Sequence, residues 1–369
     1  MQNFGHTFRD NAAVLYGALR RTPWWPHAKL VVLTPDGLGM QPFDYELYQS
    51  LSNHTVETWA DFSSRLGPAA AAAPPVRPAW PGGPALPASY EGPDQRCFSH
   101  MFVCTSGLSL PLLPAYSYGQ HVVRYYRDHG WRLQPPAELA QLPADKAAAA
   151  TAGERVLRVV FQKRAPGHPG RAVLNLQELL QRCNAWRFKL GTGTGGGARW
   201  TRAHCVEVEF ADLQSGMAAA QAADIVVGMH GANQANGWLM RPGGAIIELQ
   251  AFEFERVPEH LQHPERNMMD PATRVQWYVI MACDPEASLP GSNELAGRGR
   301  RVDWVKARSM RVRWDALEAA LRTAASTAGD MAAYRRLWQQ GRWWWHMLPG
   351  EQLRHGGPDR SATCPGMRL

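Results

Sequence analysis

Short apolar runs alternate with amphipathic segments through the second half of the chain. Apolar runs of five or six residues are typical of strands that are buried on both faces, and the segments between them have helical spacing. The predicted strands are 156–161, 205–210, 224–228 and 245–249, and the predicted helices between them are 175–183, 212–222 and 232–240. Because the connections are short, the pattern predicts a doubly wound domain, a parallel sheet with helices on both faces.

The first half shows the same pattern more weakly. A helix is predicted over 6–20, because Phe8, Ala12, Leu15 and Leu19 share one face at helical spacing. A short strand is predicted at 30–33, and strand character returns later. Two amphipathic helices are predicted to close the chain. These further segments are a strand at 97–105 and helices at 314–324 and 331–347.

The patterns divide the chain into two domains, which its 369 residues accommodate readily. Stretches rich in Ala, Pro and Gly separate or interrupt the patterned regions. The expected organisation is an N-terminal Rossmann-like domain at 1–134 with a surface insertion at 65–95, a linker at 135–154, a second α/β domain at 155–325, and a C-terminal helix and tail at 326–369.

Composition narrows the class of ligand. Hydrophobic residues make up 45% and charged residues 19%, so the chain is globular. The 39 Lys and Arg against 32 Asp and Glu favour an anionic partner. The basic residues are scattered, which disfavours nucleic acid and leaves a membrane surface or a phosphorylated small molecule as the anionic partner. The six cysteines form no CxxC pair and no zinc-like spacing, so we expect no metal site, and their pairing stays open.

A glycine-rich segment at 191–196 formally matches the dinucleotide fingerprint GxGxxG. That motif has meaning only where a strand enters it and a helix leaves it. Here the exit leads to another predicted strand, so the segment is interpreted as a glycine loop. A Rossmann oxidoreductase is therefore disfavoured.

The segment 223–249 is a complete strand, loop, helix and strand unit. Gly228 and Gly231 bracket a tight turn where backbone can approach a ligand. The helix that follows offers unpaired N–H groups to an anion such as a diphosphate. Glu248 ends the next strand, where its carboxylate suits two ribose hydroxyls. The alternative is a purely structural turn, since every unit of this kind needs one.

The same segment resembles the signature of glycosyltransferase family 61, in which a His-Gly-Ala turn leads to an Asn-containing helix, a Pro-Gly stop and a Glu-bearing strand. Other blocks resemble the family in the same order from Asn3 to about Ala282. These blocks are Asn3-Phe4-Gly5-His6 with Asp10, Arg96-Cys97-Phe98, Phe161 to Arg164, Arg171 to Asn175, and a post-signature helix over 267–282.

The resemblance implies a GT-B-type α/β fold, with two Rossmann-like domains facing a cleft and C-terminal helices packing back on the first domain. The first domain would lie on the acceptor side, and the second would bind the nucleotide sugar. The aromatic stretch 342–346 would suit that return; the alternatives are an exposed acceptor platform and a membrane-facing patch. It also implies an inverting glycosyltransferase that uses a UDP-sugar carrying N-acetylglucosamine, xylose or arabinose, with a glycan or glycoprotein hydroxyl as acceptor. No nucleic acid and no cofactor beyond this co-substrate are expected.

Charge on the leaving diphosphate must be stabilised during transfer. No Asp-x-Asp motif is present, so we expect no metal and assign this role to the helix and to cations. Arg164 and Arg171 are candidates by resemblance, and Lys163 lies beside them; surface ion pairing is the alternative. The predicted donor-binding residues are Lys163, Arg164, Arg171, Gly228, His230, Gly231, Ala232, Asn233, Asn236 and Glu248.

An inverting transferase needs a base for the acceptor hydroxyl. His6 and Asp10 lie four residues apart on one helix face, and an Asp that orients a His forms a suitable pair. The alternative is that His6 caps or packs the first helix. His230 is expected to touch the phosphates or the sugar, because it belongs to the donor half.

One departure from the family pattern keeps a second interpretation open. The residues Asn233-Gln234-Ala235 stand where the family commonly has Gly-Leu-Thr, so a catalytically inactive nucleotide-sugar or glycan-binding relative is the alternative.

The resemblance places such enzymes in the Golgi or endoplasmic reticulum lumen, usually behind an N-terminal anchor that we expect this chain to lack. Asn53-His54-Thr55 is a possible N-glycosylation acceptor.

Overall fold

The computed structural model divides the chain into two units, Met1–Arg132 (unit 1) and Leu133–Leu369 (unit 2). The residues that it describes are 7–23, 25–32, 40–64, 114–143, 147, 155–163, 170–188, 200–257, 262–356 and 364.

Unit 1 is mainly helical in its described part. The helix predicted over 6–20 is confirmed from Thr7 onward, as a π-helical turn that continues into an α-helix. Of its predicted apolar face, Phe8, Ala12 and Leu19 are buried and Leu15 is half-buried. The elements are η1 (Thr7–Ala12), α2 (Ala13–Leu19), β1 (Val31–Val32), α3 (Pro42–Gln49), β2 (Glu57–Thr58), α4 (Trp59–Ser64) and α5 (Ala115–Asp128).

An aromatic cluster holds the helices of unit 1 together. The ring of Tyr118 on α5 packs against Phe8 at 5.0 Å and against Tyr16 at 5.6 Å, and its hydroxyl donates to the Leu47 carbonyl at 2.7 Å. The strands described in this unit form one parallel pair of two residues each. A Rossmann-like first domain therefore stays a prediction, and the strand expected at 97–105 lies outside the described residues.

Unit 2 is built on a seven-stranded sheet in the order β11-β10-β7-β6-β5-β3-β4. The strands are β3 (Arg155–Lys163), β4 (Trp200–Glu209), β5 (Ile225–Met229), β6 (Ala245–Gln250), β7 (Gln276–Ala282), β10 (Trp344–Met347) and β11 (Leu353–His355). All neighbours are parallel except β11, which pairs antiparallel with β10. The α/β class and the mostly parallel sheet agree with a Rossmann-like domain.

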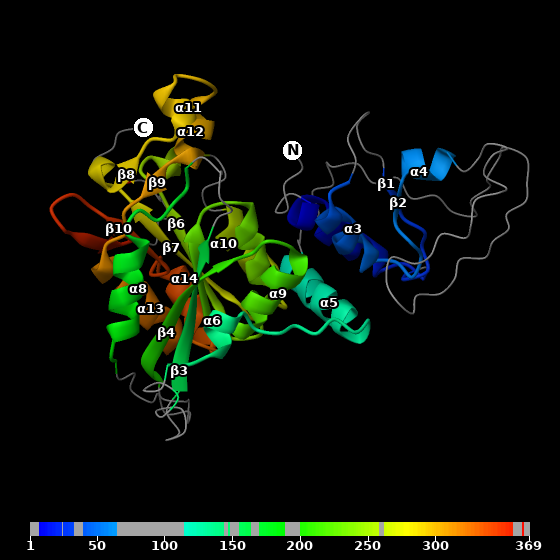
Figure 1. The fold of residues 1–369 in the computed structure, drawn as a ribbon, viewed down its shortest axis with the longest axis horizontal. Coiled ribbons are helices and arrows are strands. Elements are labelled where there is room, and N and C mark those ends of the chain that lie inside the picture. Colours follow the sequence, from blue (N-terminus) through cyan, green and yellow to red (C-terminus); the bar gives the residue numbers. More distant parts are fainter. Residues whose placement is uncertain are drawn as a thin grey trace, which may run out of the picture. The chain divides into compact units, whose positions relative to one another are not determined.

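Helices cover both faces of this sheet (Figure 1). Those of one face, α8, α13 and α14, share a core with the strands, and the opposite face carries α9, η3 and α10. The helical elements of unit 2 are α6 (Ala137–Ala140), α8 (Leu176–Ala185), α9 (Leu213–Ala222), η3 (Ala232–Leu239), η4 (Phe254–Arg256), α10 (Gln262–Met269), η5 (Pro285–Ala287), α11 (Ser292–Leu295), α12 (Arg301–Ala307), α13 (Trp314–Ser326) and α14 (Met331–Gln339). A separate two-stranded pair joins β8 (Ser288–Leu289) to β9 (Ser309–Met310).

The three central strands explain why the sheet forms where it does. Every residue of β5, β6 and β7 is buried, and continuous apolar runs of this kind are typical of parallel strands that helices cover on both faces. Along each strand, successive side chains point to opposite faces of the sheet. Ile247 and Leu249 join the core under α8 and α13, whereas Ile246 and Glu248 face η3 and α10.

The helix predicted at 331–347 is wrong in its second half. The helix ends at Gln339, and Trp344–Met347 form strand β10, which pairs with β7. Aromatic residues favour strands, and all four residues of β10 are buried. The tryptophan stretch therefore packs within the core of unit 2, instead of forming the helix that was expected to pack back on the first domain.

The post-signature helix predicted over 267–282 is also wrong for most of its length. Only Gln262–Met269 are helical, and Gln276–Ala282 form the buried strand β7. Pro271 separates the two. The predicted helix at 232–240 is present as the 3₁₀ helix η3.

Two disulfide bonds lie in unit 2. Cys183 on α8 is bonded to Cys205 on β4, and Cys283, directly after β7, is bonded to Cys364 near the end of the chain. They settle the pairing of four of the six cysteines.

Among the described residues, no helix is both long enough and apolar enough to span a membrane.

Candidate functional site

The strand order of unit 2 reverses between β3 and β5. The chain leaves β3 for β4 at the edge, whereas β5 lies on the other side of β3. In doubly wound sheets, ligands bind outside the carboxyl ends of the strands at this reversal. Gln162 and Lys163 end β3, and His230 follows directly after Met229, which ends β5. The sequence-predicted loop thus lies at the position where the topology favours a ligand.

Three successive backbone amides in this loop have no hydrogen-bond acceptor among the described residues. They are the N–H groups of Gly231, Ala232 and Asn233; the first amide that bonds is that of Gln234, which donates to the Gly231 carbonyl at 3.0 Å. Gly231 is buried, and the other two are half-buried. An unpaired amide in such a position costs about 1–3 kcal/mol, which a bound anion would offset.

Two glycines allow the close packing of this loop. A Cβ on Gly228 would lie 2.5 Å from Nε2 of Gln234 and 2.9 Å from Oε1 of Gln162. A Cβ on Gly237 would lie 1.7 Å from Cδ1 of Ile246, so η3 packs directly on β6. Because these two residues are glycines, the loop and η3 can pack directly against the sheet.

The polar residues after the loop are structural in this arrangement. Asn236 donates from Nδ2 to the Asn233 carbonyl at 2.9 Å, and Gln234 donates from Nε2 to the Met229 carbonyl at 3.3 Å. Both side chains are buried. Gln162 reaches the same Asn233 carbonyl at 3.4 Å. Asn233 and Asn236 thus stabilise the loop, and Gln234 holds its start.

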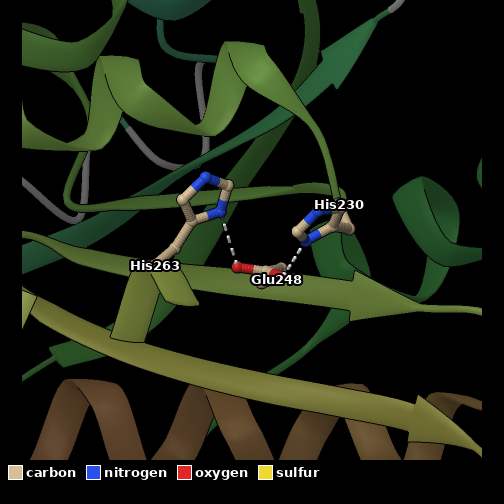
Figure 2. A group of neighbouring side chains, drawn as sticks. All are labelled: His230, Glu248 and His263. Atoms are coloured by element: carbon tan, nitrogen blue, oxygen red, sulfur yellow. Dashed lines mark hydrogen bonds and ion pairs between the residues drawn. The ribbon is translucent and has the colours of Figure 1, made fainter. Parts of the chain in front are cut away.

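Glu248 lies at the centre of a buried hydrogen-bond network beneath the loop (Figure 2). Its Oε1 accepts from Nδ1 of His230 at 2.6 Å and from Nε2 of Gln250 at 2.8 Å. Its Oε2 accepts from Nε1 of Trp277 at 2.9 Å and from Nδ1 of His263 at 3.4 Å. With four donors and 0% exposure, the carboxylate presents no surface to a ribose.

The network keeps Glu248 ionised. Burial by itself would raise the pKa of this carboxyl, but the charge and hydrogen bond of His230, followed by those of His263, lower the pKa well below its usual range. The His230 ring stacks on His263 with centroids 5.0 Å apart and contacts Phe254 at 4.4 Å. The orientation of His230 is therefore fixed on two sides, while 12% of its side chain stays exposed.

His230, Glu248 and His263 are also the one group within the described residues whose atoms could together hold a metal ion. Two ligands at ~2.1 Å from one ion lie about 3 Å or more apart. The His230–Glu248 separation of 2.6 Å is shorter than that and fits a charge-assisted hydrogen bond. The geometry of the group is that of a hydrogen-bonded network.

Arg171 is the predicted phosphate ligand whose surroundings are most distinctive. Its φ of 59° is uncommon for a residue other than glycine, and its N–H donates to the Ala307 carbonyl at 3.1 Å. The side chain is half-buried, and burial lowers the pKa of the guanidinium. No ion pair or hydrogen bond engages it within the described part of the chain. A half-buried cation without a counter-charge suits an anionic ligand.

Packing connects Arg171 to the His230 loop. Ala307 ends α12, whose Val305 packs against Phe254, and the Phe254 ring contacts His230. Lys163 is exposed at the end of β3. Arg164, which follows it, lies outside the described residues.

A cavity of about 410 Å³ opens beside the ends of β3 and β4. Its polar lining includes Lys163, Glu207, Glu209 and Ser215, and its apolar lining includes Val208 and Ala218. Sequence reasoning did not single out this cavity.

The proposed base, His6 with the side chain of Asp10, lies outside the described residues, as does the glycine segment at 191–196. Sequence reasoning missed His263 and Trp277, the partners of Glu248. Alternation along β6 was a usable signal for Gln250, because it lies two residues after Glu248 on the same face, whereas nothing in the sequence marks His263.

One family model matches the chain. It is described as Glycosyltransferase 61 and covers residues 4–247, which is more than half of the chain and includes the His230-Gly231-Ala232 loop. A search of curated proteins found no match.

Proposed function

The chain belongs to glycosyltransferase family 61 and is a glycosyltransferase, and from this premise we propose that it is an inverting, metal-independent enzyme that uses a UDP-sugar. The sugar is N-acetylglucosamine, xylose or arabinose, and the acceptor is a hydroxyl of a glycan or protein. The observation that carries the proposal is the row of unpaired amides at Gly231, Ala232 and Asn233, at the point where the strand order reverses.

In this proposal the amides bind the donor diphosphate, as N–H groups at helix starts commonly do. Arg171 supplies the positive charge that a metal supplies elsewhere, together with Lys163 and Arg164. Fixed hydrogen-bond donors and cations then stabilise the charge that develops on the leaving phosphate oxygens. Fixed donors are effective because they need no reorganisation during the reaction.

Glu248 acts on the donor through His230 and makes no direct contact with the ribose. Because Nδ1 of His230 points to the carboxylate, a phosphate or sugar meets the Nε2 edge of the ring. Through this edge the ring would contact the diphosphate or the sugar of the donor.

The transfer step is a single displacement. The acceptor oxygen forms a bond to the anomeric carbon while the bond from that carbon to the diphosphate oxygen breaks, and the electron pair leaves with UDP. His6, oriented by Asp10, takes the acceptor proton. His6→Ala is therefore expected to leave UDP binding intact and to abolish transfer; sugar transfer at the normal rate would assign the base elsewhere.

A donor panel tests the proposal. The full chain is incubated with each of the three UDP-sugars and a pool of glycan and glycoprotein acceptors, and UDP release and sugar transfer are measured. We expect turnover with one donor and none after His230→Ala. Absence of UDP release with every donor contradicts the proposal, and UDP-induced thermal stabilisation without turnover would assign the chain to the non-catalytic alternative.

Arg171 has a matched control. Arg171→Ala is expected to weaken UDP binding about tenfold, because a hydrogen bond to a charged group contributes roughly 1.5–3 kcal/mol. Arg335→Ala removes the same charge from an exposed position on α14 and should leave UDP binding unchanged. Equal effects of the two substitutions would mean that only net charge matters.

We further propose that the chain acts in the Golgi or endoplasmic reticulum lumen, and that its two units form the GT-B arrangement with the predicted domain limits. The two disulfides suit an oxidising compartment. Asn53, the possible glycosylation acceptor, is exposed. Glycosidase sensitivity of the protein expressed in a eukaryotic cell, and its loss in Asn53→Gln, would test the compartment.

A further inference from the structure

The segment after β6 carries a side chain that packs directly on His230. β6 ends at Gln250, beside the end of β5, and the chain then runs into η4. The ring of Phe254 on η4 lies 4.4 Å from the ring of His230, centroid to centroid, and this phenylalanine is buried. The position of Phe254 therefore decides, on one side, how the His230 ring is oriented.

Glu253, directly before η4, has a backbone conformation that is uncommon for a residue with a Cβ. Its φ of 65° and ψ of 11° lie in the left-handed region, so the surrounding structure must hold it there. Its carboxylate lies 2.6 Å from the guanidinium of Arg301, 3.2 Å from that of Arg308 and 3.5 Å from that of Arg256. Ion pairs thus hold the side chain of the strained residue.

Arg308 is the most buried of these three arginines, with 14% of its side chain exposed. Its Nε and Nη2 donate to the Glu294 carboxylate on α11 at 2.9 Å and 2.5 Å, and its Nη1 donates to the Phe252 carbonyl at 3.0 Å. A guanidinium bound to a carboxylate through two nitrogens has a defined geometry. Because Phe252 and Glu253 are neighbours, this one side chain holds both the backbone and the carboxylate at the left-handed residue.

The end of α12 connects the same arginine to the second predicted phosphate ligand. Arg308 follows Ala307, the last residue of α12, whose carbonyl accepts from the N–H of Arg171 at 3.1 Å. Val305 of the same helix packs against Phe254. The end of α12 thus supports both the segment that carries Arg171 and the loop that carries Phe254.

From these contacts we propose that Arg308 is a positioning residue of the donor site, which keeps Glu253 in its left-handed conformation and thereby holds Phe254 against His230. The inference rests on the proposed function, because it takes His230 as a contact of the donor. Without Arg308 the loop relaxes in the free protein, and a bound donor has to restore it. The cost of that conformation then appears as weaker donor binding.

Two substitutions at Glu253 separate the backbone conformation from the ion pairs. Glu253→Ala and Glu253→Gly both remove the carboxylate, but glycine adopts a φ of 65° without strain. We expect Glu253→Gly to bind UDP about tenfold more tightly than Glu253→Ala in calorimetric titrations, the factor that corresponds to a left-handed residue with a Cβ. This pair decides the question even if Arg308→Ala does not fold.

The arginine itself is tested in two backgrounds. Arg308→Ala is expected to weaken UDP binding about tenfold in the otherwise wild-type chain, for the same reason. In the Glu253→Gly background it should weaken binding less, because the residue at 253 then needs no support. Urea unfolding of each variant gives the folded fraction to which the affinities are referred.

A spectroscopic readout reports the contact between the rings. The imidazole proton resonance of His230, identified by its absence in His230→Ala, is sensitive to the neighbouring Phe254 ring. We expect this resonance to move in ligand-free Arg308→Ala and Glu253→Ala, and to stay nearer its wild-type position in Glu253→Gly. A loss of stability alone would leave the resonance in place, because the molecules that remain folded would keep the contact.

Arg322→Ala is the matched control. Arg322 on α13 also donates from two nitrogens to a carboxylate, that of Glu318, and its guanidinium also lies over an aromatic ring, that of Trp186. Its removal should leave the UDP affinity and the His230 resonance unchanged.

Two results would overturn the inference: UDP affinity of a folded Arg308→Ala variant equal to that of the wild type, or equal UDP affinities of Glu253→Gly and Glu253→Ala. The proposed donor loop would survive either result. Failure of the wild type to bind UDP would instead overturn the proposed function, and this inference with it.

Discussion

Glu248 was expected to hold a ribose and instead holds His230. If Glu248 acts only through the His230 ring, then UDP affinity should no longer depend on the carboxylate once that ring is removed. We expect Glu248→Gln to weaken UDP binding about tenfold in the wild type, and to have no further effect in a His230→Ala background. Calorimetric affinities of the four proteins form a double-mutant cycle. Additive losses would contradict a role through His230 and favour a direct contact.

His346 on β10 predicts a pH dependence of folding stability that does not involve the donor site. Burial, followed by the charge of Arg354, lowers the pKa of this residue from 6.5 to about 4. The unfolded chain therefore binds the proton more readily, so stability is full above about pH 6.5 and is lost as the pH falls toward 4. The loss is up to about 3 kcal/mol.

The measurement is the urea midpoint of unfolding between pH 7 and 4. His346→Phe keeps a ring of similar size and should flatten this dependence, because neither ring nitrogen has a hydrogen-bond partner within the described residues. An unchanged slope in the variant would show that other groups cause the loss.

The site residues differ in how far the sequence could predict them. Gly228, His230 and Gly231 lie in a local motif, so the sequence alone places them at the end of β5. The role of Glu248 depends on Trp277 and His263, which come from different elements and meet it only through the packing of α10 and β7. No spacing pattern in the sequence predicts a contact of that kind, so a carboxylate available to the ribose was the natural expectation.

The 3₁₀ helix η3 depends on its direct packing against β6. Gly237→Ala places a Cβ 1.7 Å from Cδ1 of Ile246, so the buried isoleucine or the helix must shift. We expect a loss of about 1–3 kcal/mol in the free energy of unfolding, together with weaker UDP binding, because η3 carries the loop amides.

Ile246→Val in the same protein removes the clashing methyl group. It should restore part of both quantities, as measured by denaturant unfolding and UDP titration. If Ile246→Val only adds to the loss, the clash assigned to this pair is wrong.

Strands were predictable where apolar runs are short and bounded, as for β3, β5 and β6. The failures at β7 and β10 share a cause. Both are short, largely apolar segments that follow a helix closely, and in such segments periodicity alone does not distinguish a helix from a strand. Only the pairing with β6 and with each other decides that they are strands.

The two units also differ in how much the sequence predicts. The strand and helix pattern of unit 2 follows a regular alternation from β3 to β6, so its doubly wound class could be read from the order of the elements. Unit 1 has short elements joined by long stretches rich in Ala, Pro and Gly. Its architecture depends on contacts distant in sequence, such as those of Tyr118, and patterns do not predict these.

The donor site proposed for unit 2 binds a diphosphate through backbone amides, His230 and arginine without a divalent cation. Calorimetric titration of the full chain with UDP, once in excess EDTA and once with Mn²⁺, tests this. The account predicts binding in EDTA with the same affinity as with Mn²⁺. Loss of UDP binding in EDTA, restored by Mn²⁺, would contradict it.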